Sequence, residues 1–464
     1  MRRMRWAALC GLAFLLWMFS VPAWGQTAEE WFRRGREATS PDDQIRYYTE
    51  YLRLRPDDYV GYNNRCIAYR AKKLTDLALA DCNRSVQMKS DFALAYNNRG
   101  NVYLDKGQFD LAIADYSRSI QLDRNYALAY NNRGVAYHDK KMHDLALSDL
   151  TEAIRLDGGK PLYHRNRGRL QIDRKNYPAA IEDMNRAIQM EPGEAYNFYH
   201  RGRARELAKM TDEAIQDYTQ AIRLNPSDTY FNRNRGYLYL DKELYDLAVA
   251  DYNKHLGAVP DDHVSFNNRA VAYENKGQID LALADYAKAA QINPKYALPH
   301  RNRGRIFQGR KQYDLAVIEY TKAFERDPKD ISSVRWRAQS YKAMKRWEEA
   351  RNDFEKAYQA DPASAAANNS LAWFLATCPG PASCRNGKRA VEHALKAVGL
   401  DYSASYMDTL AAAYAEDGRW EDAVRTQEQA VAMLRQQKAS EKRIADYQTR
   451  ADLFKKKKPH REAE

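Results

Sequence analysis

The string Tyr-Asn-Asn-Arg-Gly at Tyr96–Gly100 decides the fold, because it returns unchanged at Tyr130–Gly134 and with one difference at Tyr62–Cys66. The interval between successive copies is 34 residues. The small residue that ends the string keeps this interval at Gly168, Gly202, Gly236, Ala270, Gly304, Ala338 and Ala372. A fixed interval of this length indicates tandem copies of one supersecondary element rather than two or three separate domains. We number the 34 places of each repeat so that Gly100 stands at place eight of repeat 3.

Small and aromatic residues recur inside each repeat where two packed helices need them. Place twenty is alanine in nine successive repeats, and a larger side chain there would push the two helices of a hairpin apart. Tyrosines recur at places eleven and twenty-four, where we expect them to fill the space between neighbouring hairpins. Proline recurs where the second helix should stop, at Pro192, Pro226, Pro260, Pro294, Pro328 and Pro362. The pattern predicts an all-α chain of helix-turn-helix repeats.

These intervals of glycine, alanine, aromatic residues and proline resemble the tetratricopeptide repeat over roughly residues 30–437. The resemblance implies a right-handed superhelical solenoid of about twelve repeats, whose first helices line a concave groove. It also implies a binding or scaffolding role without chemistry of its own. The strings LAWFLATCP, RNGKRAV and LAAAYAEDGRWEDAV are similar to a module that closes many bacterial tetratricopeptide proteins.

The register divides the chain into five segments: a signal peptide (1–25), a degenerate first repeat (26–56), regular repeats (57–367), two last repeats with an extended loop (368–437), and a closing helix with a basic tail (438–464). Terminal repeats of solenoids are often irregular, because they have a neighbour on one side only. The extended loop runs from Thr377 to Lys388.

The first 25 residues carry the three parts of a secretory signal. A basic start (Arg2–Arg5), an apolar run (Trp6–Val21) and two small residues, Ala23 and Gly25, precede an expected cut at Gln26. We therefore expect a periplasmic or secreted bacterial protein. The alternative is an inner-membrane anchor facing the periplasm, because an uncleaved apolar run is nearly long enough to span a bilayer.

The chain is basic, with a formal net charge of +12 at pH 7, and removal of the three arginines of the signal segment leaves +9. A basic surface suits nucleic acid or acidic partners. Export argues against nucleic acid, so we expect a protein or extended peptide as partner, with acidic segments as one option. Contact with a membrane is expected only if the signal segment stays uncleaved.

Place seven is arginine nine times in succession, and an acid stands sixteen residues after each arginine. The pairs are Arg65 and Asp81, Arg99 and Asp115, Arg133 and Asp149, Arg167 and Asp183, Arg201 and Asp217, Arg235 and Asp251, Arg269 and Asp285, Arg303 and Glu319, and Arg337 and Asp353. Repeats 11 and 12 lack both partners, with Leu371 facing His393 and Leu410 facing Thr426. This joint presence and absence predicts an arginine–carboxylate contact inside each hairpin rather than a track for polyanions.

Place six is expected on the concave side and is asparagine in most repeats, at Asn64, Asn98, Asn132, Asn166, Asn234, Asn268 and Asn302, with His200 as an interruption. An asparagine amide offers a donor and an acceptor, which match one peptide group. The series resembles the asparagine ladder in the repeat domain of O-linked N-acetylglucosamine transferase, which implies contact with peptide backbones. In the alternative interpretation these asparagines, with those at place five, bridge neighbouring first helices.

Places five and nine hold a carboxylate in tetratricopeptide chaperone adaptors, although those proteins use lysine and asparagine there. This chain has arginines at these places, namely Arg165, Arg169, Arg203, Arg233, Arg301 and Arg305. Two of the pairs stand four residues apart on one helix face, so each pair could converge on one anion. The alternative is a solvated basic face.

Four cysteines follow the signal segment, and an even number suits pairing in an oxidising compartment. Cys378 and Cys384 flank a short loop, so we predict a disulfide between them. Cys66 and Cys82 lie on facing helices, where a bond and two buried thiols are both compatible with the pattern. No metal site is expected, because the loop spacing is wrong for zinc and no histidine pair is near.

The motifs of metalloproteases, serine hydrolases, P-loop enzymes and dinucleotide-binding enzymes are missing. We therefore expect no enzymatic activity and no cofactor. The sequence predicts an exported scaffold that binds protein or peptide segments in a basic, asparagine-lined groove. Two alternatives stay open: a structural subunit of a cell-envelope or secretion assembly, and a regulatory subunit of a separate enzyme.

Overall fold

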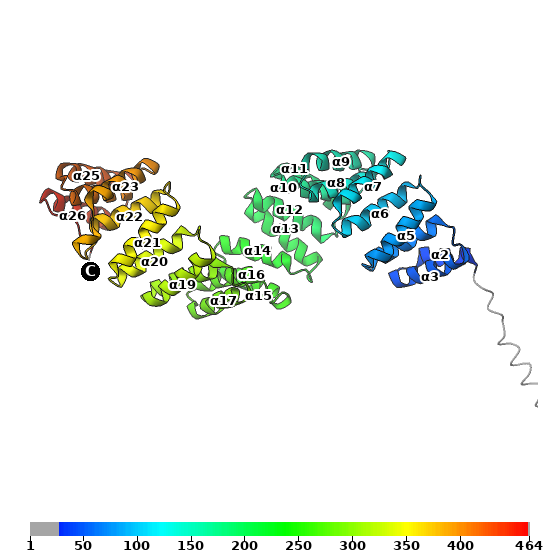
Figure 1. The fold of residues 1–464 in the computed structure, drawn as a ribbon, viewed down its shortest axis with the longest axis horizontal. Helices are drawn as coiled ribbons and strands as arrows, with labels where there is room; N and C mark the ends of the chain where they lie inside the picture. Colours follow the sequence, from blue (N-terminus) through cyan, green and yellow to red (C-terminus); the bar gives the residue numbers. More distant parts are fainter. Residues whose placement is uncertain (1–26, 463–464) are drawn as a thin grey trace, which may run out of the picture. The chain divides into compact units, whose positions relative to one another are not determined.

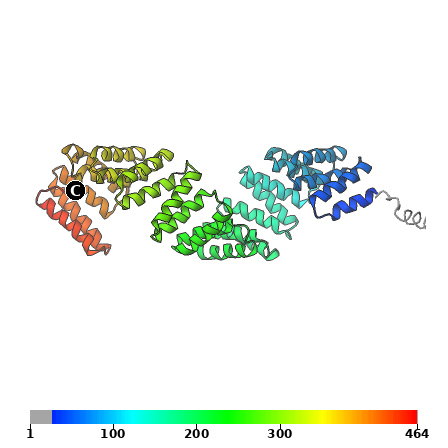
Figure 2. The same cartoon turned by 90° about the horizontal axis from the view of Figure 1, so that it is seen from below.

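A computed structural model describes residues 27–462, so the expected signal peptide lies outside the described residues. The described part of the chain contains the α-helices α2 to α26, one 3-10 helix (η1) and no strand. Consecutive helices pack as antiparallel hairpins, as Figures 1 and 2 show. The predicted all-α repeat fold is confirmed. The chain divides into an N-terminal unit, Met1–Phe231, and a C-terminal unit, Asn232–Glu464.

The helices of the N-terminal unit repeat with nearly constant lengths. Their bounds are α2 (Ala28–Glu37), α3 (Pro41–Leu54), α4 (Tyr59–Ala71), α5 (Thr75–Met88), α6 (Ala93–Asp105), α7 (Phe109–Leu122), α8 (Ala127–Asp139), α9 (His143–Leu156), α10 (Pro161–Asp173), α11 (Tyr177–Met190), α12 (Ala195–Leu207) and α13 (Thr211–Leu224), followed by α14 (Tyr230–Asp241), in which the boundary between the units falls.

The C-terminal unit continues the same alternation and ends with an unpaired closing helix. Its bounds are α15 (Tyr245–Ala258), α16 (His263–Asn275), α17 (Ile279–Ile292), α18 (Ala297–Gly309), α19 (Tyr313–Arg326), α20 (Ile331–Ala343), α21 (Trp347–Ala360), α22 (Ala365–Thr377), η1 (Ala382–Cys384), α23 (Gly387–Leu400), α24 (Ala404–Glu416), α25 (Trp420–Gln436) and α26 (Glu441–Lys455). None of the described helices is long and apolar enough to cross a membrane.

The small residues hold the two helices of each hairpin close together. The alanines at place twenty are fully buried, and the tyrosine at place twenty-four packs on the small residue at place eight. At Gly100, an added Cβ atom would lie 2.7 Å from the Tyr116 ring. Tyr116 also packs with Ala136 of the next hairpin. These tyrosines therefore fill space inside a hairpin as well as between neighbouring hairpins.

The hairpin turns of repeats 2 to 10 use a left-handed residue at place fifteen. Gly107 (φ +69°) and Gly277 (φ +74°) adopt this conformation without steric cost, whereas seven repeats use a lysine or glutamate there. In repeat 4, the backbone N–H of Lys141 (φ +64°) donates to the His138 carbonyl at 2.8 Å, which closes the end of α8. The constant turn explains why 34 residues return each repeat to the same register.

The predicted contact between places seven and twenty-three is confirmed in all nine repeats that carry both residues. In repeat 3, Arg99 Nε donates to Asp115 Oδ2 and Nη2 donates to Oδ1, both at 2.7 Å. The guanidinium lies between two rings of its own helix, 5.4 Å from the Tyr96 centroid and 5.9 Å from that of Tyr103. The arginine ladder is therefore part of the core of each hairpin.

In most repeats the same arginines also connect their repeat to the one before it, which the sequence pattern did not reveal. Arg99 Nη1 donates to Asn83 Oδ1 of α5 at 3.0 Å, and Arg133 Nη1 donates to Ser117 Oγ of α7 at 3.0 Å. Each of these guanidinium groups thus joins its own helix to the second helices of two repeats. Lysine, with a single nitrogen, could not make these contacts at once.

A second series of ion pairs joins neighbouring repeats at the surface, between place fourteen and place eighteen of the preceding repeat. One example is the contact of Lys106 Nζ with Asp76 Oδ1 at 2.6 Å. Repeat 6 has Ala208 at place fourteen, and repeat 5 has Pro178 at place eighteen, so both partners are missing together. Each exposed ion pair contributes little to the free energy of unfolding, so we infer that this series fixes the register between neighbouring repeats rather than their stability.

Candidate binding surface on the first helices

The asparagines of place six form a hydrogen-bonded series with those of place five. Asn98 Nδ2 donates to Asn63 Oδ1 of the preceding repeat at 2.9 Å, and the same bond joins Asn132 to Asn97 at 3.0 Å. Further bonds of this kind join Asn166 to Asn131 and Asn302 to Asn267. This geometry matches the bridging interpretation. Asn132 Nδ2 also donates to Asn101 Oδ1 at 3.1 Å, so both of its N–H groups are used, whereas one bridging bond leaves Asn98 and Asn166 a second N–H.

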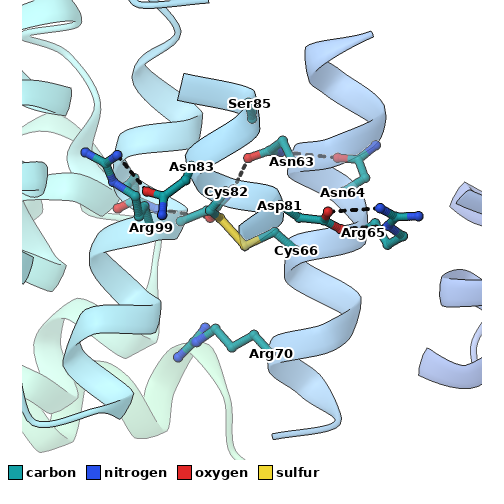
Figure 3. Close-up of a disulfide and its surroundings, with 12 residues drawn as sticks. Asn63, Asn64, Arg65, Cys66, Arg70, Asp81, Cys82, Asn83, Ser85 and Arg99 are labelled. Atoms are coloured by element: carbon teal, nitrogen blue, oxygen red, sulfur yellow. Dashed lines mark hydrogen bonds and ion pairs between the residues drawn. A yellow bond between two sulfur atoms is a disulfide. The ribbon is translucent and has the colours of Figure 1, made fainter. Parts of the chain in front are cut away.

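All seven asparagines of place six are at least partly buried. Asn166 is buried, and Asn64, Asn98, Asn132, Asn234, Asn268 and Asn302 are half-buried. Within a helix, the place-five amide also donates to its neighbour, as Asn63 Nδ2 does to Asn64 Oδ1 at 3.3 Å (Figure 3). The side chains are therefore held in fixed orientations by one another.

Repeats 5 and 6 interrupt this series with a basic cluster, which we call the arginine patch: Arg165 and Arg169 of α10, and His200 and Arg203 of α12. Loss of solvent around the imidazole, followed by the charges of Arg169, Arg165 and Arg203, lowers the pKa of His200 to about 3. The ring is therefore neutral at pH 7, and its electrostatic environment is strongly positive.

Two members of the arginine patch lack a direct ion pair, although Arg203 interacts electrostatically with Glu206, one turn further along α12. Arg169 and Arg203 are exposed, and within residues 27–462 neither makes a hydrogen bond or an ion pair. Arg165 is more constrained, with Nη1 donating to Asn197 Oδ1 at 3.3 Å and lying 4.0 Å from Glu191 Oε2. The exposed guanidinium groups of Arg169 and Arg203 therefore make no direct contact with an acid of the described chain.

Family models described as TPR repeat or tetratricopeptide repeat match the chain at residues 100–141, 143–195, 203–263, 263–296, 336–364 and 403–436. Together these matches cover more than half of the 464 residues. The chain is a tetratricopeptide-repeat protein. Proteins built from this repeat generally serve as non-catalytic scaffolds for protein or peptide partners.

Several solved tetratricopeptide structures are similar to this one. PilF of Pseudomonas aeruginosa is 18% identical with a TM-score of 0.42, over 47% of this chain and 97% of its own. Yeast Tom70 is 16% identical with a TM-score of 0.36, over 92% of this chain and 94% of its own. YrrB, described as having an unusual peptide-binding site, is 20% identical with a TM-score of 0.33, over 40% of this chain and 95% of its own.

The predicted arginines of the C-terminal unit have acidic neighbours, in contrast to the arginine patch. Arg233 Nε lies 3.1 Å from Asp262 Oδ2. Arg301 Nη1 lies 3.5 Å from Asp330 Oδ1, and Arg305 Nη2 lies 2.9 Å from Glu274 Oε1. Arg301 and Arg305 therefore pair with different acids, and the expectation that they converge on one free anion is wrong for this tetratricopeptide-repeat protein.

The predicted disulfide between Cys378 and Cys384 is absent, because both thiols are free and buried. Burial raises the pKa of the Cys378 thiol to about 11, so this group stays protonated, whereas disulfide formation requires a thiolate. The disulfide instead joins Cys66 of α4 to Cys82 of α5, beside the Arg65–Asp81 pair (Figure 3). The described residues contain no cluster of histidine, cysteine or acidic side chains that could hold a metal ion.

Proposed function

We propose that this protein is an exported scaffold that binds acidic, extended segments of partner proteins at the arginine patch. The observation that carries the proposal is the exposure of Arg169 and Arg203 without a direct ion pair, beside a neutral His200. In contrast, the nine arginines of place seven each have a carboxylate inside their own hairpin. The patch thus concentrates positive charge, of which Glu191 beside Arg165 and Glu206 near Arg203 offset only a part.

Guanidinium groups suit carboxylates, because their planar N–H donors can bind two oxygens at once. The patch draws on two successive first helices, α10 and α12. An extended segment with spaced acidic side chains could reach both helices, whereas a single carboxylate would meet only one. We therefore favour an acidic stretch of a partner over an isolated anion.

We propose a supporting role for the asparagine series next to the patch. The bridged amide of Asn166 is fixed in orientation and keeps a second N–H, and the Asn132 amide keeps a lone pair on its oxygen. Such amides suit the N–H and carbonyl groups of a peptide backbone, which every sequence presents. In this scheme the asparagines contribute affinity and the arginines select acidic segments.

Two observations support export. The segment before Gln26 has the basic, apolar and small-residue parts of a secretory signal. The Cys66–Cys82 disulfide suits an oxidising compartment, where such bonds persist. A periplasmic or secreted location follows from this proposal, and an uncleaved anchor facing the periplasm is the alternative. N-terminal sequencing of the cell-derived protein distinguishes the two, because an intact Met1 would contradict cleavage.

Affinity purification from cell envelopes tests the binding proposal. Partners captured by the parent protein should be lost with Arg169→Ala/Arg203→Ala. They should be retained with Arg186→Ala/Arg223→Ala, which removes the same charge from exposed positions on the second helices α11 and α13 of the same two hairpins. Equal capture by both variants would contradict the proposal.

A row of exposed leucines favours a second candidate, a structural subunit of a larger envelope assembly. Place nineteen on the second helices carries Leu77, Leu111, Leu145, Leu247, Leu281 and Leu315, each between 44% and 51% exposed. Exposed apolar side chains at a constant place can serve subunit contacts. Release of the protein from envelopes as part of a stable complex that survives Arg169→Ala/Arg203→Ala would favour this candidate.

A further inference from the structure

The segment after the closing helix folds back onto the first helices of repeats 10 and 11. Helix α26 ends at Lys455, and the Lys458 N–H donates to the Leu453 carbonyl at 3.0 Å, which reverses the chain. Residues 459–462 then reach α22, where the backbone N–H of Glu462 donates to the Thr377 carbonyl at 3.1 Å. A segment outside the repeats therefore contacts the last turns of two successive first helices, α20 and α22.

The Glu462 carboxylate is held by two donors from different first helices. Lys342 Nζ of α20 lies 2.8 Å from Oε2, and Trp373 Nε1 of α22 donates to Oε1 at 2.7 Å. The Lys342 and Glu462 side chains are only 21% and 25% exposed, so water screens this pair less than a surface pair. The indole N–H fixes the orientation of the carboxylate, which a lysine alone would not do.

The neighbouring residue Arg461 contacts Glu416, an acid that also pairs with Arg385 Nε at 3.3 Å. Arg461 Nη2 lies 2.6 Å from Glu416 Oε2 at the end of α24, and Nη1 donates to the Ala376 carbonyl at 3.2 Å. The His460 ring lies on the other side, 5.7 Å from the Trp373 ring. The surface thus recognises a basic residue followed directly by an acidic one, through side chains and backbone together.

This surface continues into an open cavity. Its volume is about 530 Å³, and its lining includes Gln308, Lys345 and Trp347 in addition to Lys342 and Trp373. His460 and Glu462 form part of its wall. A ligand longer than residues 459–462 could therefore continue along the same face.

We propose that Lys342, Trp373, Thr377 and Glu416 form a second binding site, for a partner segment with a basic residue followed by an acidic one, and that residues 459–462 occupy it until the partner displaces them. Trp373 stands at place nine, the place of Arg169 and Arg203 in repeats 5 and 6. The proposal uses other residues than the arginine patch, so it stands or falls independently of the function proposed above.

The test compares the parent chain with an open variant of the full chain, Arg461→Gln/Glu462→Gln. The probe is a fluorescent peptide of residues 456–462, capped at both ends, and binding is followed by anisotropy. The open variant should bind the probe, and the parent should bind at least about fivefold more weakly, because its own tethered segment competes. Equal probe affinity in the parent and the open variant would contradict the proposal that residues 459–462 occupy the site and must be displaced.

Specificity is tested in the open variant. Lys342→Met should reduce probe affinity by about tenfold or more, whereas Lys388→Met, which removes an exposed lysine of α23 in the same unit, should leave it unchanged. A probe in which glutamine replaces the glutamate should bind the open variant as weakly as the unmodified probe binds the open variant that also carries Lys342→Met. Circular dichroism must show unchanged helix content. Equal affinities for the two lysine variants would show that the segment does not bind at this site.

An independent measurement does not depend on the probe. The Trp373 indole N–H resonance, assigned with Trp373→Phe, should shift between the parent and the open variant, and probe addition should shift it back. An identical resonance in both proteins would contradict the contact between Trp373 and Glu462.

Discussion

Arg99 and Asp115 face each other across the α6/α7 hairpin, with two hydrogen bonds of 2.7 Å between the guanidinium and the carboxylate. The pair is mostly buried, with 19% of the arginine and 8% of the aspartate side chain exposed. Buried pairs of this kind cost desolvation energy, so their net stabilisation is small, but the loss of one partner leaves an uncompensated charge.

We therefore expect Arg99→Leu alone to lower the free energy of unfolding by about 3–5 kcal/mol. The double variant Arg99→Leu/Asp115→Thr copies the leucine and threonine of repeat 12, Leu410 and Thr426, and should recover much of that loss. Urea unfolding of the parent, both single variants and the double variant gives the coupling energy. Losses that simply add would contradict a direct contact in solution.

The asparagine bridges should contribute to stability whether or not a peptide binds. Asn98→Ala removes the amide that donates to Asn63 Oδ1, so we expect a loss of about 1 kcal/mol in the free energy of unfolding. Asn125→Ala, in an exposed turn, is the matched control and should change little. If Asn98→Ala weakens peptide binding without any loss of stability, the bridge is not formed in the free protein.

The Cys66–Cys82 bond should account for measurable stability. It closes a span of 16 residues, for which the loss in Cys66→Ala/Cys82→Ala is expected to be about 3 kcal/mol. Cys66→Gly/Cys82→Tyr copies the Gly100 and Tyr116 of repeat 3, in which a ring packs on a glycine, and should restore part of the loss.

Alkylation of the unreduced, unfolded protein checks the pairing. Cys378 and Cys384 should be labelled, and Cys66 and Cys82 should be labelled only after reduction. The opposite labelling would show that the loop disulfide forms instead.

His200 should make stability depend on pH in a defined direction. Its folded-state pKa, about 3, lies below the ordinary value of 6.5. Between these two pH values the unfolded chain therefore binds a proton at this imidazole and the folded chain does not. Above pH 6.5 His200 therefore does not lower the free energy of unfolding. This free energy falls as the pH falls from 6.5 towards 3, with a slope of at most about 1.4 kcal/mol per pH unit.

The matched variant is His200→Asn, because asparagine stands at this place in the neighbouring repeats. Unfolding free energies between pH 7 and pH 4 should fall less steeply for this variant than for the parent. Parallel curves would mean that the imidazole is not held neutral by its surroundings.

Much of the fold could be predicted because the chain repeats itself. The arginine and the acid are both missing in repeats 11 and 12, and this joint loss indicated that the two side chains contact each other elsewhere. The sixteen-residue interval identified which side chains face each other. Cys66 and Cys82 are separated by the same sixteen residues, so this interval also carried the signal for the correct disulfide. The prediction of a loop disulfide relied on the short loop instead, and in the structure both loop thiols are free and buried.

Contacts without periodicity could not be predicted. The return of Glu462 to Lys342 joins residues 120 positions apart and occurs once, so no second copy reveals it. The direct ion pairs of Arg301 and Arg305, and the lack of direct ion pairs at Arg169 and Arg203, depend on how neighbouring repeats pack in three dimensions. All these arginines follow one sequence pattern, and only their three-dimensional surroundings decide which of them form a direct ion pair.

The central claim, that the arginine patch binds acidic segments, is tested most directly by nuclear magnetic resonance of the His200 imidazole. A capped peptide of alternating glutamate and serine serves as the probe, and its glutamine counterpart is the control. A bound carboxylate should raise the pKa of His200 from its low value, because a nearby negative charge favours the protonated ring. We predict a saturable shift of the His200 signal with the acidic peptide and none with the control. An acidic peptide that binds with no change in the His200 signal or pKa would contradict the account.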